Sequence, residues 1–184
     1  MRFEAFLERL ASHSDRVAVV CRGEEFGYAR LAQEIELWRA RIRNARLKGR
    51  AIGYAGDFGL GSIALQFACL AEGNVVVLLP RDHDQAGYLR DGCVTDVVTA
   101  DSDDLTAQPV RGPRSHPTLA TLLSRHEPGL VIFSSGSSGL PKAALHSLDG
   151  FLSKFERPGR AMRTLAFLMF DHIAGQDTLF HTLN

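Results

Sequence analysis

The sequence predicts an α/β protein with a mostly parallel sheet flanked by helices. Residues 50–55 form an apolar strand pattern, residues 62–72 have helical spacing, and residues 75–79 are a second apolar run closed by Pro80. Strand, helix and strand in this order are typical of a βαβ unit, whose two strands pair in parallel. The composition, 45% hydrophobic and 23% charged, is that of a globular protein, so we expect the 184 residues to form a single domain.

The segment before this unit predicts two helices and a hairpin. Apolar residues repeat at helical spacing over 1–10 and again over 29–47, where Gly49 follows as a stop signal. Between them, 17–21 and 24–28 are strand-like and meet at a glycine turn.

The segment after the unit continues the alternation of strands and helices. Residues 101–117 are rich in Asp, Ser, Pro and Gly and lack periodicity, so we expect an exposed connection there. The other predicted elements are a helix at 85–90, a strand at 96–100, a helix at 118–125, a strand at 130–134, a loop at 135–141, a helix at 147–155, a strand at 164–170 and a helix at 176–183.

Charge and cysteine content exclude several classes of protein. Lys plus Arg equals Asp plus Glu at 21 each, so the chain lacks the basic surplus that nucleic acids and anionic membranes attract. The apolar runs are too short to span a bilayer, and Glu4 and Glu8 in the first helix are atypical of a signal peptide. Cys21, Cys69 and Cys93 are too far apart for a disulfide framework or a metal site, so we expect free thiols and a cytoplasmic protein.

The most informative segment follows the strand at 130–134 and reads FSSGSSGLPKA from Phe133 to Ala143. Glycines let successive backbone N–H groups converge on one anion, serine hydroxyls add donors, and Lys142 adds a positive charge. These features favour a phosphate-binding loop, although the composition alone equally fits a flexible surface turn. A Walker A loop is excluded, because Lys142 follows Pro141 and precedes Ala143.

This segment resembles the Ser/Thr/Gly-rich signature of the adenylate-forming superfamily, which includes acyl-CoA synthetases, luciferases and the adenylation domains of nonribosomal peptide synthetases. Ala143 departs from the glycine that ends the family pattern. Weaker similarities at 26–31, 70–80 and 170–175 follow in the family's order. The matching positions are Phe133, Ser135, Gly136, Ser137, Gly139, Pro141 and Lys142, with Ser134 and Ser138 in place of threonines.

The resemblance implies a reaction and a set of site residues. A carboxylate attacks the α-phosphorus of ATP in the presence of Mg²⁺, pyrophosphate leaves, and the acyl-adenylate passes to a thiol of CoA or of a carrier protein. His172 is expected to line the acyl site, with a buried or solvent-facing histidine that has no ligand role as the alternative. The residues expected to bind the β- and γ-phosphates are Ser134, Ser135, Gly136, Ser137, Ser138, Gly139 and Lys142.

The rest of the family's catalytic residues are expected further along a longer chain. They include the adenine-binding segment, the metal-binding glutamate, the ribose-binding aspartate and the C-terminal lysine. We therefore expect residues 1–184 to be the incomplete N-terminal portion of the large domain, inactive alone and prone to self-association. Two alternatives are a non-catalytic nucleotide- or phosphate-binding module and a degenerate interaction domain.

Overall fold

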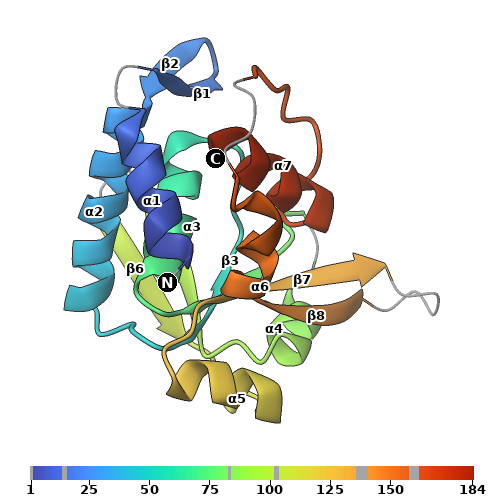
Figure 1. Ribbon diagram of the computed structural model, residues 1–184. Helices are drawn as coiled ribbons and strands as arrows, with labels where there is room; N and C mark the ends of the chain where they lie inside the picture. Colours follow the sequence, from blue (N-terminus) through green and yellow to red (C-terminus); the bar gives the residue numbers. More distant parts are fainter. Residues whose placement is uncertain (1, 14–15, 83, 102–103, 136–140, 158–161) are drawn as a thin grey trace.

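The fold is an α/β sandwich around one mixed sheet, which confirms the predicted class (Figure 1). A six-stranded sheet has the order β6-β5-β3-β4-β7-β8, and the hairpin of β1 (Val17–Cys21) and β2 (Glu24–Gly27) stands apart from it. The inner strands are parallel: β5 (Asp96–Asp101), β3 (Ala51–Tyr54), β4 (Val75–Leu78) and β7 (Gly129–Ser135). The computed structural model describes residues 2–13, 16–82, 84–101, 104–135, 141–157 and 162–184.

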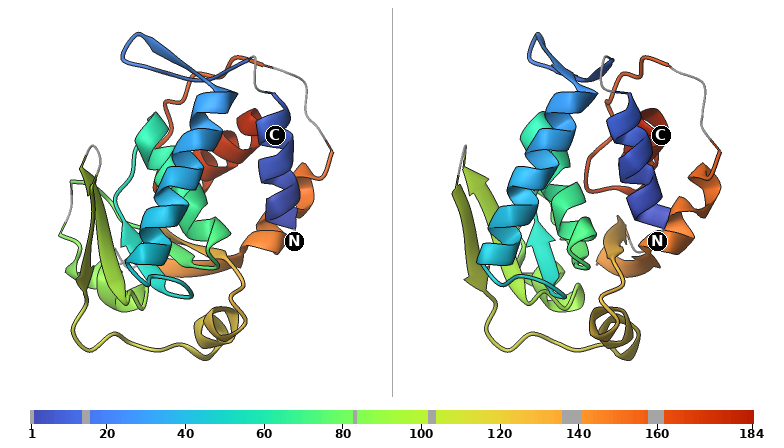
Figure 2. Two further views of the ribbon diagram at one scale, coloured as in Figure 1. Left: turned by 90° about the vertical axis from the view of Figure 1, so that its left-hand side faces the viewer. Right: turned by 60° about the vertical axis from the view of Figure 1, so that its left-hand side comes forward.

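Helices cover both faces of the sheet, as Figure 2 shows. The second face carries α4 (Ala86–Asp91) and α5 (Pro117–Ser124). No helix in the described ranges is long and apolar enough to cross a membrane. The first face carries α1 (Arg2–Ser12), α2 (Tyr28–Asn44), α3 (Leu60–Ala71), α6 (Leu148–Leu152) with a 3-10 turn (Ser153–Phe155), and α7 (Ile173–Leu183).

The inner strands have apolar side chains on both faces because both faces are covered. In β4, Val76 and Leu78 enter the larger core and Val75 and Val77 the smaller one, as the alternation of a strand requires. The larger core is rich in phenylalanine, and the ring centroids of Phe67 and Phe180 lie 5.2 Å apart. This core joins α3, early in the chain, to α7 at its end.

The exposed connection predicted at 101–117 is wrong over Asp104–Pro109, which forms the edge strand β6. This strand runs antiparallel to β5 from Asp96↔Pro109 to Asp101↔Asp104. Leu105 and Ala107 pack on the core while their neighbours face solvent. The polar residues of an edge strand hid this alternation in the sequence. Residues 110–116 do lie outside helices and strands and are mostly exposed, as expected.

Two other segments differ from the sequence prediction. The strand predicted at 164–170 is wrong, since residues 162–167 have no regular structure and pair with no strand in the described part of the chain. A strand pattern cannot form a strand without a neighbour to supply hydrogen bonds. Conversely, Pro141–Ser147 forms the edge strand β8 because β7 pairs with it along its full length. The sequence left residues 142–146 unassigned and placed Pro141 in a loop and Ser147 at the start of a helix.

Candidate functional site

Strands β7 and β8, which flank the predicted phosphate loop in the sequence, pair with each other as an antiparallel hairpin (Figure 1). Pairing runs from Gly129↔Ser147 to Ser134↔Lys142 and Ser135↔Pro141. The hairpin therefore brings Ser134, Ser135 and Lys142 together at the end where the loop begins. The four other predicted phosphate ligands lie outside the described residues: Gly136, Ser137, Ser138 and Gly139.

The part of the hairpin next to the loop is held in place by side chains that pack on both faces of the sheet. Ile132 of β7 enters the larger core, and Phe133 enters the smaller one. Tyr88 of α4 meets Phe133 edge to face, with ring centroids 4.7 Å apart. The ends of the loop are therefore fixed relative to the sheet.

Lys142 and Ala143 lie on β8 rather than in a loop. Lys142 is exposed and forms no ion pair with another residue of the described ranges, so its charge is free to meet an anion. Ala143 pairs with Phe133 and is absent from the residues with positive φ. Alanine in place of the family's glycine therefore causes no backbone strain here.

His172 lies on a different element from the loop. It is the exposed N-cap of α7, and its backbone carbonyl accepts from the Gln176 N–H at 3.0 Å. The buried Gln176 side chain joins this turn to α3. Its amide nitrogen donates to the Phe170 carbonyl at 2.6 Å, and its amide oxygen accepts from Gln66 Nε2 at 2.6 Å.

The turn before α7 packs on the turn after β3. Phe58 and Phe170 meet edge to face with centroids 5.2 Å apart. Gly56 is required there, because a Cβ on it would lie 2.6 Å from Phe170 Cε1. Since β3 and β7 are inner strands of the same parallel set, the Phe170 turn and the start of the predicted loop lie at the same, carboxyl, edge of the sheet.

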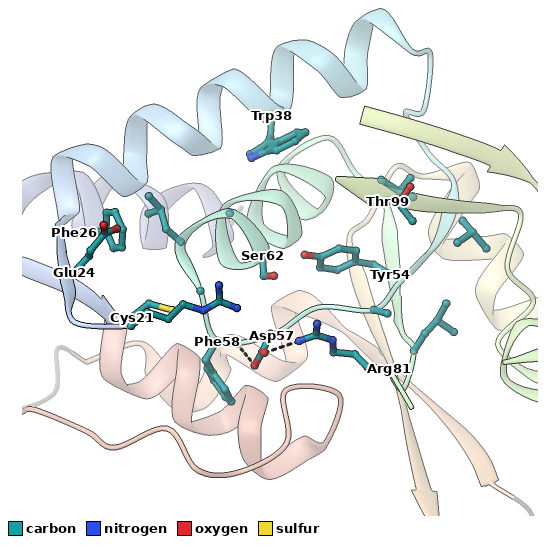
Figure 3. Close-up of a pocket in the computed structure, with 18 of the residues that line it drawn as sticks. Cys21, Glu24, Phe26, Trp38, Tyr54, Asp57, Phe58, Ser62, Arg81 and Thr99 are labelled. Atoms are coloured by element: carbon teal, nitrogen blue, oxygen red, sulfur yellow. Dashed lines mark hydrogen bonds and ion pairs between the residues drawn. The ribbon is translucent and has the colours of Figure 1, made fainter. Parts of the chain in front are cut away.

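A cavity of about 620 Å³ opens at this edge beyond β3, β4 and β5 (Figure 3). Asp57 and Arg81 form an ion pair of 2.6 Å on its wall. Burial raises the pKa of Tyr54 to about 12, although a hydrogen bond with Ser62 opposes the shift, so the phenol stays neutral at physiological pH. The sequence analysis missed these residues. The signal that could have found them is the glycine-rich turn at 56–61 between a strand and a helix.

The described residues contain no group of three His, Cys, Asp or Glu side chains that could hold a metal ion. Cys21, Cys69 and Cys93 are free thiols, as the sequence predicted.

Comparison with solved structures identifies the fold. The N-terminal subdomain of NpsA from Klebsiella oxytoca, in complex with 3-hydroxyanthranilyl-AMSN, is similar with a TM-score of 0.76 and 18% identity, over 97% of this chain and 50% of that one. O-succinylbenzoate coenzyme A synthetase (MenE) from Bacillus subtilis, in complex with AMP, gives 0.67 and 14%, over 97% and 52%. The chain has the fold of the N-terminal subdomain of adenylate-forming enzymes.

The adenylate-forming fold recurs in PA1221, a nonribosomal peptide synthetase protein containing adenylation and peptidyl carrier domains. Its TM-score is 0.70 at 20% identity, over 98% of this chain and 34% of that one. The chain thus spans about half, or less, of the length of the solved chains it matches. No protein-family model matches the sequence, and no curated protein matches it.

Proposed function

We propose that this chain is the N-terminal part of an ATP-dependent acid–thiol ligase, which activates a carboxylic acid as an acyl-adenylate with release of pyrophosphate. The single observation that carries the proposal is the FSSGSSGLPK sequence at the tip of the β7–β8 hairpin, within a fold shared with adenylate-forming enzymes. The proposal needs both observations, because one fold can host many functions and serine-rich turns are common.

The proposed role of the loop is to hold the β- and γ-phosphates of ATP. Lys142 is exposed and free of ion pairs with the described residues, so binding an anion would break no ion pair with any of them. Amide and hydroxyl donors of this segment would stabilise the phosphate charge, and such electrostatic stabilisation is usually the largest contribution to catalysis in reactions of this kind. Mg²⁺ would neutralise further phosphate charge when bound, and we assign it no ligand in this chain.

His172 is proposed to line the acyl site. It is exposed at the N-cap of α7, and the Gln66–Gln176 pair ties its turn to the core. The acceptor is proposed to be the thiol of CoA or of a carrier protein. Both kinds of acceptor occur in the names of structural neighbours: MenE is a coenzyme A synthetase, and PA1221 contains a carrier domain. We also propose a cytoplasmic location.

The decisive experiment is carboxylate-dependent exchange of labelled pyrophosphate into ATP by the intact ligase, with a panel of fatty, aryl and amino acids. Exchange with one class of acid is expected, and residues 1–184 alone should give none. A folded, intact protein that exchanges with no acid would overturn the proposal. Binding of ATP or pyrophosphate without exchange would instead identify a nucleotide-binding module.

A further inference from the structure

The cavity of Figure 3 lies at a topological switch point of the sheet. Strand β3 has β4 on one side and β5 on the other. Helix α3 connects β3 to β4 over one face, whereas α4 connects β4 back to β5 over the opposite face. In open α/β sheets, ligands bind in the crevice outside the carboxyl ends of strands at such a point. The cavity is lined from the ends of all three strands, by residues such as Tyr54, Leu79 and Thr99.

The N-terminus of α3 opens into this cavity. The N-cap is Gly59, which has no side chain to accept hydrogen bonds, and the helix continues for 12 residues. The N–H groups of Leu60, Gly61 and Ser62 find no acceptor among the described residues, and all three residues line the cavity. Such a helix end carries partial positive charge and attracts anions.

Trp38 is an independent sign of a ligand. Its side chain projects from α2 toward the cavity (Figure 3), and the residue is only 2% exposed. The indole Nε1–H is buried and has no hydrogen-bond acceptor within the described ranges. Buried tryptophan N–H groups usually have a partner, so this donor calls for an acceptor that the chain does not supply.

The rest of the wall limits the size and polarity of the ligand. Phe26, Phe58 and Leu79 supply apolar surface, whereas the charged lining residues balance as two arginines and two carboxylates. Arg81 is already paired with Asp57. The first-turn N–H groups of α3 and the indole N–H of Trp38 lack an acceptor among the described residues, which suits one small anionic group on an apolar body. The Glu24 carboxylate on the same wall disfavours a highly charged polyphosphate.

We propose that this cavity binds a small carboxylate with an apolar or aromatic body, whose carboxylate accepts hydrogen bonds from the first turn of α3. The site is separate from the β7–β8 loop and does not depend on the function proposed for that loop. Arg81 would exchange its bond with Asp57 for one with the ligand.

The test uses Trp38 as a reporter, because it is the only tryptophan in the chain. Titration of the 184-residue protein with benzoate should change the Trp38 fluorescence saturably, whereas the neutral isostere benzyl alcohol should not. Phenyl phosphate distinguishes carboxylates from phosphate esters and should bind more weakly than benzoate. Equal responses to all three probes, tighter binding of phenyl phosphate, or no saturable response from folded protein would each overturn the proposal.

Matched variants locate the carboxylate. Leu60→Pro removes one first-turn N–H at a position where proline is tolerated, and Leu60→Ala makes a similar side-chain truncation but keeps the N–H. Leu60→Pro should weaken benzoate binding about tenfold relative to Leu60→Ala, the effect of losing one charge-assisted hydrogen bond of about 1.4 kcal/mol. Asp57→Asn, which frees Arg81, should tighten binding, and Lys142→Ala on the loop should not change it. Three results would contradict binding of the carboxylate at the first turn of α3. They are equal affinities of the two Leu60 variants, unchanged or weaker binding by Asp57→Asn, and loss of binding in Lys142→Ala.

Discussion

Glu72 shows at the scale of one residue how a buried charge is stabilised. Its side chain is 5% exposed and follows α3. Its Oε1 accepts from Arg39 Nε at 2.9 Å and lies 2.6 Å from Arg43 Nη2. Burial alone would raise the pKa of Glu72, but hydrogen bonds from Arg43 and Arg39 outweigh burial, so the pKa is lowered. The contacts of Arg39 and Arg43 with Glu72 therefore fix α2 against the end of α3.

Glu72→Gln is expected to destabilise the protein by about 1.5–3 kcal/mol at pH 7, because hydrogen bonds between charged groups are lost. A lowered pKa in the folded state stabilises the fold above the usual value of 4.5, and this contribution is lost as pH falls through the folded pKa. Urea unfolding of the parent protein and the Glu72→Gln variant from pH 7 to pH 3 measures the difference between their free energies of unfolding, which should shrink as the pH falls. A difference in stability that grows in acid would contradict the assignment.

At the scale of elements, sequence periodicity predicted the buried parts of the fold and failed at the edges. The inner strands β3, β4, β5 and β7 were predicted because two covered faces require continuous apolar runs. Edge strands need only one apolar face and pair through the backbone, so β6 and β8 were missed. The strand predicted at 164–170 has the apolar pattern without a neighbour, which no local pattern can reveal.

The β7–β8 hairpin carries a prediction about nucleotide use. Lys142→Ala together with Ser137→Ala should reduce pyrophosphate exchange by the intact ligase while leaving its melting temperature unchanged. Lys142 is exposed, and exposed substitutions usually change stability by less than about 0.5 kcal/mol. Arg111→Ala removes another exposed positive charge and serves as the control. Unfolding of the double variant would show that the loop is structural.

The turn before α7 makes a prediction about packing. A Cβ on Gly175 would overlap the Met169 carbonyl oxygen, so Gly175→Ala must move α7 away from the turn. We expect a loss of about 1–3 kcal/mol in the free energy of unfolding, as overpacking usually costs. Gly87→Ala is the matched control, because a Cβ there meets nothing within 4 Å and alanine favours the helix α4. Equal denaturation midpoints of the two variants would count against this packing.

At the scale of the molecule, the sequence predicts a candidate site in the β7–β8 loop but does not predict the cavity. The FSSGSSGLPK signature predicts a phosphate loop because its chemistry lies in consecutive residues. The cavity is built from α2, α3 and the ends of β3, β4 and β5, and its members are far apart in sequence. Trp38 reads as an ordinary apolar residue of an amphipathic helix until the sheet is assembled around it.

The surface beside α7 supports the predicted self-association. Leu165 and Phe167 are 81% and 78% exposed, and Met169 and Ile173, close by in the sequence, are exposed as well. Exposed apolar patches of this kind mark interfaces. Purified residues 1–184 are expected to form dimers by sedimentation velocity, and Leu165→Lys with Phe167→Lys should return them to monomers. Leu37→Lys, on α2, should not. A monomeric unsubstituted chain at high concentration would refute this.

The reciprocal amides of Gln66 and Gln176 imply that folding and the orientation of His172 are separable properties. Replacing both glutamines by leucine removes the donors and acceptors together, which an apolar interior tolerates better than one orphaned amide. The Phe170 carbonyl would nevertheless lose the amide that restrains it. Such a chain should keep its fold but melt below its parent, because the Phe170 carbonyl has lost its donor, and it should hold the His172 side chain loosely while the scaffold stays intact.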